Sequence, residues 1–352
     1  MTHKVVQNTR LSSSKWQEQR DAAVRYLLMV LLVFAFFGLI LLIFGIDPIA
    51  SYRDIFASTL GSSYGFSEVI VAMIPMLITA LAVAITWRVG LINVGGEGQL
   101  YIGAAFAAWG ALTFTGLPAP VLLPLMAVLG MIGGALWAFV PGYLKAIGLV
   151  NETITTLLLN SIAPKIVGFL IFGYWHSAMD TVKTANFVPA AILPKLFGTR
   201  IHLGFFIGLI LLAAFWYVMK YSRWGLEMRA IGGNAMAAQR NGLPLKGYLI
   251  TNMCVGGAIA GLAGMVQVSG FFGVLFLNFS TGLGFMGFLI CWLAGGQPLG
   301  ILLMSFVVAI ITTGGNLLQI TRDLPYAVIN ILLAFTLFIV LARPKFFGKE
   351  KA

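Results

Sequence analysis

Residues 221–246 read YSRWGLEMRAIGGNAMAAQRNGLPLK and form the longest internal polar run of a chain that is 60% hydrophobic. Four basic residues stand in this run against a single acid, Glu227. An apolar run precedes the stretch and another follows it. The stretch is therefore a basic segment held between two apolar ones.

The centre of this stretch predicts a short helix over residues 235–240. Asn234 can cap its start, because the asparagine oxygen accepts a free backbone N–H. Gly242 can end it in the left-handed conformation, and Pro244 prevents the helix from resuming. Fewer than two turns are not stable alone in water. Either the helix docks into another protein, or the stretch is an ordinary cytoplasmic loop whose charges set topology; without a motif, the two interpretations are equal.

The composition of the whole chain indicates an integral membrane protein. Only 9% of its 352 residues are charged, whereas soluble domains carry roughly 25%, and the mean hydropathy is +0.96. The net charge of +11 comes from basic residues at the ends of apolar runs, which is typical of membrane topology rather than of a nucleic-acid partner. We therefore expect the lipid bilayer as its environment and no nucleic acid as partner.

The chain lacks the sequence patterns of a redox, metal or ATP site. Cys254 and Cys291 lie inside apolar runs and form no CxxC pair. His3, His176 and His202 are scattered without ligand spacing. No P-loop and no catalytic motif is found. We expect no metal, no cofactor and no catalytic residue on this chain.

Ten apolar runs predict helices that cross the membrane, of which the eighth is short and rich in glycine. They are 26–46, 69–87, 100–117, 121–143, 154–175, 203–219, 248–268, 282–294, 299–318 and 326–342. We therefore expect an all-α polytopic membrane protein with one transmembrane domain over 26–342, in which discontinuous helices can occur. A cytoplasmic segment 1–25 and a cytoplasmic tail 343–352 would flank that domain.

The basic residues set the expected orientation. The side of the membrane that holds both termini and the loop 220–247 carries 16 basic residues, and the opposite side carries five. Because basic loops stay in the cytoplasm, we expect both termini and this loop to be cytoplasmic, with the chain in the cell membrane.

A second informative stretch, residues 88–103, reads RVGLINVGGEGQLYIG. The glycines and polar residues at its centre are Asn93, Gly95, Gly96, Glu97, Gly98 and Gln99. One interpretation is a break in a helix along the translocation path, because a buried acid in a membrane is costly unless it faces protein or water. The other, slightly favoured by the residues alone, is a tight cytoplasmic turn with Glu97 in the first turn of the next helix.

Two shorter stretches also contain polar residues beside apolar runs. Residues 293–300, LAGGQPLG, repeat the paired glycines and hint at an internal repeat. Asn151 and Glu152 precede the fifth apolar run, where they can cap a helix and favour its dipole.

Four of these stretches resemble permease subunits of ABC importers. In the loop, Ala237-Ala238, three residues and Gly242 match the EAA–Gly pattern of the family, with Met236 in place of the Glu. The stretches NVGGEGQLYIGA (93–104), NETITTLLLN (151–160) and GGQPLGI (295–301) are similar to nucleoside-type members of the simple-sugar and nucleoside importers. The four occur in the expected order over about 70–342.

The resemblance implies an importer for nucleosides or a related small polar solute such as a simple sugar. Separate cytoplasmic ATPase subunits would bind ATP, a second permease would complete the path, and an extracytoplasmic solute-binding protein or lipoprotein would deliver the solute. The ATPase-coupling residues would be Gly233, Asn234, Ala237, Ala238, Arg240 and Gly242. Asn151 and Glu152 would form a second cytoplasmic contact.

The alternative is a stand-alone secondary transporter that uses broken helices at 95–98 and 295–296. The scarcity of charged residues inside the apolar runs counts against it. A membrane-embedded enzyme is a more distant alternative.

Overall fold

The computed structural model describes residues 31–32, 34–177, 180–196 and 198–322, and beyond these the positions 325, 327, 328, 331, 334 and 335. The expected segments 1–25 and 343–352 lie outside the described residues, as do the start of the first apolar run and most of the tenth. The chain divides into two units, one comprising Met1–Ser58 with Gly314–Ala352 and the other Thr59–Thr313.

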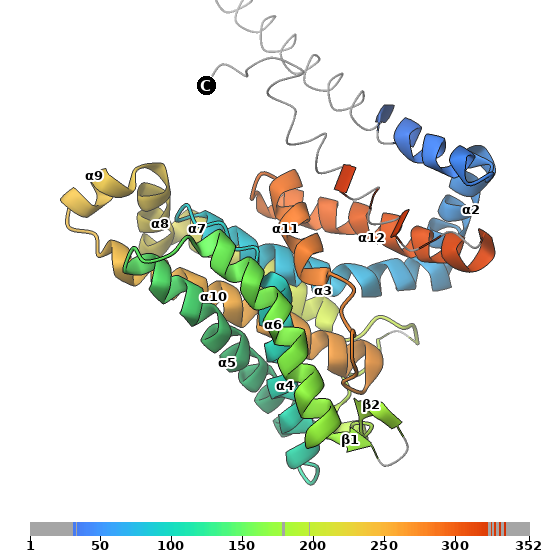
Figure 1. The fold of residues 1–352 in the computed structure, drawn as a ribbon, viewed down its shortest axis with the longest axis horizontal. Helices are drawn as coiled ribbons and strands as arrows, with labels where there is room; N and C mark the ends of the chain where they lie inside the picture. Colours follow the sequence, from blue (N-terminus) through green and yellow to red (C-terminus); the bar gives the residue numbers. More distant parts are fainter. Residues whose placement is uncertain are drawn as a thin grey trace, which may run out of the picture. The chain divides into compact units, whose positions relative to one another are not determined.

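The larger unit is a bundle of helices with a small amount of strand (Figure 1). Its helices are α3 (Ser63–Trp87), α4 (Gly96–Thr113), α5 (Ala119–Ala146), α6 (Glu152–Gly173), α7 (Gly204–Tyr221), α8 (Arg223–Gly233), α9 (Ala235–Arg240), α10 (Leu245–Val266) and α11 (Leu283–Leu293). A π-helical turn, η2 (Gln267–Phe272), extends α10, and α12 (Pro298–Arg322) begins in this unit. The strands are β1 (His176–Ser177) and β2 (Asp180–Thr184), followed by the 3₁₀ turn η1 (Pro189–Ala191).

Six helices in the described part of the chain are long and apolar enough to cross a membrane, by length and composition alone. They are α3, α5, α6, α7, α10 with η2, and α12. A seventh is possible if the helix Phe34–Ile43 and α2 (Pro48–Leu60), bent by 117°, count as one span. α4 is not among the six, since its first turn is polar, and α11 is shorter than a span. The chain is a mostly helical, multi-pass membrane protein.

Helix α4 is the central element of the bundle. Every residue from Gly96 to Ala105 is buried, because α5, α10, α6, α11 and α3 all pack on it. The most extensive contact in the bundle is between α10 and α5. There Gly134 and Gly257 lie so close that a side chain on either would overlap the facing backbone. Close approach through small residues is the usual way in which membrane helices associate.

The loop between α6 and α7 folds back over the end of α10. The Thr184 N–H donates to the Leu275 carbonyl at 2.9 Å and the Phe187 N–H to Gly273 at 2.8 Å. The Ser269 hydroxyl donates to the Ala191 carbonyl at 2.6 Å. The buried ring of His202 fills the space beside Gly270. This loop is held in place by η2 and the residues after it.

The smaller unit contains a helix that the hydropathy pattern did not predict. Asp47 caps α2, its carboxylate accepting from the Ile49 N–H at 2.8 Å. Asp54 on α2 pairs with Arg322 at the end of α12 at 2.8 Å. Because α2 contains polar residues, it is not an apolar run and was not predicted from hydropathy.

Candidate functional site

The short helix expected within the polar run is α9, with the predicted bounds. Asn234 has extended backbone angles, and its side-chain oxygen accepts from the Ala237 N–H at 3.0 Å. At the other end the Asn241 side chain donates to the Ala237 carbonyl at 2.9 Å. Gly242 has φ +84, the left-handed geometry that favours glycine. Local hydrogen bonds therefore fix both ends of α9.

A second helix, α8, precedes α9 and was missed from the sequence. The Ser222 hydroxyl caps it, accepting from the Gly225 N–H at 2.9 Å. Glu227 pairs with Arg223 at 2.9 Å and accepts a hydrogen bond from the Tyr248 hydroxyl on α10. The Tyr248 hydrogen bond therefore links α8 to α10. The Tyr248 hydroxyl first, and Arg223 next, lower the pKa of Glu227.

The α8–α9 loop, residues 220–247, presents one face of α9 to its surroundings. Met236 is 64% exposed, and Ala237 and Arg240 are exposed as well. Ala238 is buried within its own chain. The two alanines of the sequence pattern thus differ in exposure. Ala237 lies on the exposed side of α9, whereas Ala238 faces its own chain.

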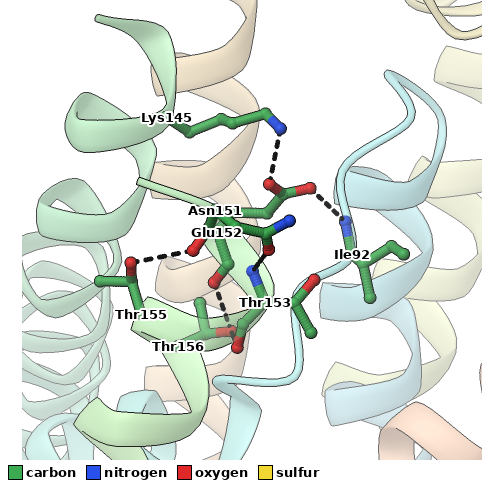
Figure 2. Close-up of polar contacts among 7 residues, drawn as sticks. All are labelled: Ile92, Lys145, Asn151, Glu152, Thr153, Thr155 and Thr156. Carbon is green, nitrogen blue, oxygen red and sulfur yellow. Dashed lines mark hydrogen bonds and ion pairs between the residues drawn. The ribbon is translucent and has the colours of Figure 1, made fainter. Parts of the chain in front are cut away.

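Asn151 and Glu152, the second predicted contact with a partner, lie at the start of α6 and make hydrogen bonds or ion pairs within their own chain (Figure 2). The exposed Asn151 caps α6, accepting from the Thr153 N–H at 2.8 Å. Glu152 is buried and pairs with Lys145 at 2.7 Å. Figure 2 shows its other carboxylate oxygen facing the Ile92 N–H, which donates at 3.4 Å. Glu152 thus joins the end of α5, the start of α6 and the segment that leads to α4.

That segment, residues 91–95, is an irregular stretch set against α6. Asn93 is fully buried. Its side-chain amide pairs reciprocally with that of Gln99, at 3.1 and 3.2 Å, and accepts from the Gly95 N–H at 2.9 Å. The interpretation of this stretch as a tight turn did not anticipate that the Asn93 side chain is packed inside the bundle.

Asn160, two turns into α6, completes the hydrogen bonds of this segment. Its side-chain oxygen accepts from the Gly98 N–H at 2.8 Å, and its amide donates to the Val94 carbonyl at 2.8 Å. Both backbone groups would otherwise be unpaired at the start of α4. Gly98 itself faces the Trp137 ring too closely for a side chain. Irregular backbone inside a membrane protein requires such partners.

Glu97 lies between the first turns of two helices. It belongs to the first turn of α4, as expected, and is 5% exposed. Its carboxylate accepts from the Gly284 N–H at the start of α11 at 2.7 Å, and the Ser280 side chain is a further partner. Helix N-termini favour negative charge. A side chain at Gly284 would overlap the backbone of Glu97, so the two helix starts are in direct contact. We call residues 91–99 with Asn160 and 280–284 the α4–α11 junction.

Within the described ranges, no group of three His, Cys, Asp or Glu side chains could hold a metal ion. Cys254 and Cys291 are both free thiols. The polar groups of the α4–α11 junction bind one another, and the α8–α9 loop offers an exposed surface. The two regions therefore differ in what they leave available to a ligand or partner.

Comparison with known proteins identifies the family. A model of the branched-chain amino acid transport system permease component matches residues 65–340. The chain belongs to this family. The permease is 32% identical to the guanosine ABC transporter permease protein NupP of Bacillus subtilis, over 89% of this chain and 91% of that protein. It is 31% identical to the nucleoside ABC transporter permease protein NupB of Lactococcus lactis subsp. cremoris, over 90% of each chain.

A further relative of the permease is a glucose ABC transporter permease protein of Haloferax volcanii, 31% identical over 91% of this chain and 87% of that protein. A solved structure, PsaBC from Streptococcus pneumoniae in complex with Fab, aligns with 82% of this chain and 95% of that chain at a TM-score of 0.49 and 13% identity. The sequence relatives favour an ABC importer permease over the stand-alone secondary transporter.

Sequence reasoning missed the partners that come from distant parts of the chain. Gly284 is 187 residues from Glu97, and nothing in the local pattern indicates that they meet. Tyr248 and the cap of α8 were likewise not singled out. The available signal for α8 was Ser222, three positions after the end of an apolar run and followed by mixed apolar and polar residues.

Proposed function

We propose that the permease imports nucleosides or a related small polar solute such as a simple sugar, driven by separate ABC ATPase subunits that bind the α8–α9 loop. The observation that carries the docking proposal is the exposed face of α9. A helix of six residues gains little stability by itself, yet it is capped at both ends and presents a small side chain, Ala237, outward. Small side chains permit close approach of a partner.

The substrate class rests on the relatives. Two of the similar permeases are described as acting on guanosine or nucleosides and one on glucose. Nucleosides and simple sugars share uncharged, hydroxyl-rich chemistry. The scarcity of charged residues in the predicted spans is compatible with such a solute.

The α4–α11 junction is proposed as a wall of the translocation path, not as a set of solute ligands. The side chains of Asn93 and Gln99 hydrogen-bond to each other, and that of Asn160 hydrogen-bonds to backbone groups. Glu97 is committed to the start of α11. These residues would keep the two helix starts in place while the solute passes.

The remaining partners follow from the same proposal. A second permease, identical or different, would complete the path, and an extracytoplasmic solute-binding protein or lipoprotein would deliver the solute. The α8–α9 loop and both termini would face the cytoplasm of a cell whose plasma membrane holds the permease. Asn151, exposed at the start of α6, would be a secondary contact for the ATPase, whereas the buried Glu152 would act only inside the chain.

Co-purification tests the docking proposal. The tagged permease would be isolated in mild detergent from its own cells, and the proteins recovered with it identified by mass spectrometry. We expect a P-loop ATPase with the native chain, and its loss when Ala237 is replaced by Trp. The matched control is Ala185→Trp, the same change at an exposed alanine of the loop between β2 and η1.

The outcomes separate the alternatives. Retention of the ATPase by the Ala237→Trp variant would show that α9 is not the docking element. A native chain that purifies without an ATPase, and that moves solute in vesicles under an ion gradient without ATP, would establish the secondary transporter instead.

A further inference from the structure

Helix α11 is held at both ends by a single short segment. At its start, the Gly284 N–H donates to the Glu97 carboxylate at 2.7 Å. Just past its end, the Gly296 carbonyl accepts from the Arg88 guanidinium at 2.6 Å. Arg88 and Glu97 are separated by only eight residues, so one short segment contacts both ends of α11.

The two charges match the helix dipole. A helix start carries partial positive charge and a helix end partial negative charge, so a carboxylate at the first and a guanidinium at the second are both favourable. Hydrogen bonds that involve a charged group are stronger than neutral ones. Stacking of Trp87 on Trp292, with ring centroids 5.1 Å apart, adds an apolar contact at the Arg88 end. Helix α11 and the segment 88–97 therefore form one mechanical unit.

Helix α8 touches this unit at Arg88. The backbone of Gly232, near the end of α8, lies against the Arg88 carbonyl so closely that a side chain there would overlap it. Only Gly233 and the cap Asn234 separate this contact from α9. The Arg88 guanidinium also lies over the buried ring of Phe215 on α7, at 5.7 Å. Arg88 is thus the residue at which α3, α7, α8 and the end of α11 meet.

We propose that Arg88 transmits movement of the α8–α9 loop to α11, so that α11 shifts with the loop when the ATPase closes. Arg88 is a positioning residue: it touches neither the solute nor ATP, and it acts through the Gly296 carbonyl. This inference rests on the proposed docking of α9. It assigns to Arg88 a role beyond that of a basic residue that fixes topology at the end of α3.

The test is the coupling ratio of the complete importer. Permease, ATPase subunits and solute-binding protein are reconstituted together, and ATP hydrolysis and uptake of radiolabelled guanosine, or of glucose if guanosine is not carried, are measured. For Arg88→Gln we expect the complex to assemble and hydrolyse ATP while uptake per ATP falls roughly tenfold, the loss expected for one charged hydrogen bond. Arg88→Lys keeps a donor and should retain an intermediate ratio.

The matched control is Arg200→Gln. Arg88 combines a hydrogen bond to a carbonyl with an aromatic contact. Arg200 similarly combines a polar contact, the ion pair with Glu68 at 3.0 Å, with an aromatic contact, to Phe271 at 5.6 Å, but lies in the loop before α7. Its loss should lower the thermal midpoint without changing uptake per ATP. Equal effects of the two substitutions on the thermal midpoint and on the coupling ratio would mean that Arg88 is only a structural contact.

A distance measurement supplies a readout that a structural role would not change. Spin labels are placed at Met236 on α9 and Phe285 on α11, which are 64% and 43% exposed, in one permease copy with Cys254 replaced by Ser. In the otherwise native chain the distance between them should stay constant through the ATP cycle, because both ends move together. In Arg88→Gln it should change when ATP binds.

Each result has one meaning. A native permease that assembles with no ATPase refutes the docking on which the inference rests. An assembled Arg88→Gln complex with normal uptake per ATP, or with the same label distances as the native chain in every state, refutes the transmission and leaves docking intact.

Discussion

The α8–α9 loop and the α4–α11 junction are both polar, glycine-containing interruptions of an apolar chain, yet they are built in opposite ways. In the loop, the caps of α9 are satisfied by residues three or four positions away. In the junction, the partners of Gly98 and Glu97 are 62 and 187 residues away. Local pairing leaves a surface free for another protein. Pairing between distant residues leaves the polar groups of the junction without free hydrogen-bonding capacity and joins the helices to one another.

Glycine has a different purpose in each region. Gly242 adopts the left-handed conformation, and no atom lies near the position of an added side chain. The loop therefore needs the backbone freedom of glycine at this position. Gly284 supplies the absence of a side chain where two helix starts touch. Substitutions in the junction should therefore cost stability, whereas substitutions on the exposed face of the loop should cost only partner binding.

The largest expected effect is at Gly284. Replacing it with Val would force a side chain into the backbone of Glu97, and overpacking typically costs about 1–3 kcal/mol and occasionally more. We expect a strongly lowered thermal midpoint in detergent, or failure to accumulate in the membrane. Gly233→Ala is the control, since no atom lies within 4 Å of the added carbon. Equal midpoints for the two variants would contradict the direct contact.

The next effect compares two asparagines on α6. Asn160→Leu leaves the Gly98 N–H and the Val94 carbonyl unpaired inside the bundle, at roughly 1–3 kcal/mol for each buried group. Asn151→Ala removes an exposed helix cap, which costs about 1 kcal/mol. Thermal unfolding followed by size-exclusion chromatography should rank them in that order. The reverse order would mean that Asn160 is not essential to the break before α4.

The third prediction concerns the pH dependence of stability. It arises from His202, which lies in the loop before α7 and outside the two regions compared above. Burial first, and Lys195 next, lower the pKa of His202 to about 4, from about 6.5 in an unfolded chain. The unfolded state thus binds the proton more readily. Stability should fall as pH drops from 6.5 toward 4, by about 2 kcal/mol at pH 5. The measurement is the thermal midpoint between pH 7 and 5.

The His202→Phe variant provides the control for this pH dependence. Its midpoint should be lower at pH 7, because the Gly204 N–H loses the ring nitrogen that accepts from it at 3.2 Å. Its slope between pH 7 and 5 should be much flatter than that of the native chain. An unchanged slope would show that another group titrates in this window.

The smallest effect is expected in the α8–α9 loop. Tyr248 and Arg223 lower the pKa of Glu227, so its contacts should persist above the ordinary carboxyl pKa of about 4.3 and be lost only as pH falls through the lowered value. Hydrogen exchange of residues 222–247, corrected for the intrinsic rate, should therefore be the same at pH 7 and 5. Glu227→Gln should raise it only a few-fold, since exposed ion pairs contribute little. A large change in either experiment would mean that the loop is held more firmly than its contacts indicate.

The sequence predicted those parts of the molecule in which the physical cause is local. The bounds of α9 follow from Asn234 and Gly242, which act within their own turn. The apolar runs anticipated α3, α5, α6, α7, α10 and α12, because each of these helices is long and apolar enough to cross a membrane. The position of Glu97 in a first turn was also predicted, from the preference of a helix start for an acid.

The sequence could not predict contacts whose two partners lie far apart along the chain. The segment before α4 was expected as a turn, since nothing local indicates that Asn160 satisfies it from α6. Helix α2 has a mixed composition and was absent from a search based on hydropathy. The different exposure of Ala237 and Ala238 depends on which side of α9 faces its own chain. A helix of six residues is too short for its sequence periodicity to show which side that is.

The central claim, that the exposed face of α9 meets the ATPase, is tested most directly by site-specific cross-linking in native membranes. A photo-reactive cross-linker would be attached to a cysteine at Met236, and in a parallel chain at Tyr174, which is 78% exposed at the end of α6, with Cys254 replaced by Ser in both. The account predicts a covalent product with a P-loop ATPase from position 236 and none from position 174. Equal cross-linking from both positions, or no ATPase product from position 236, would contradict it.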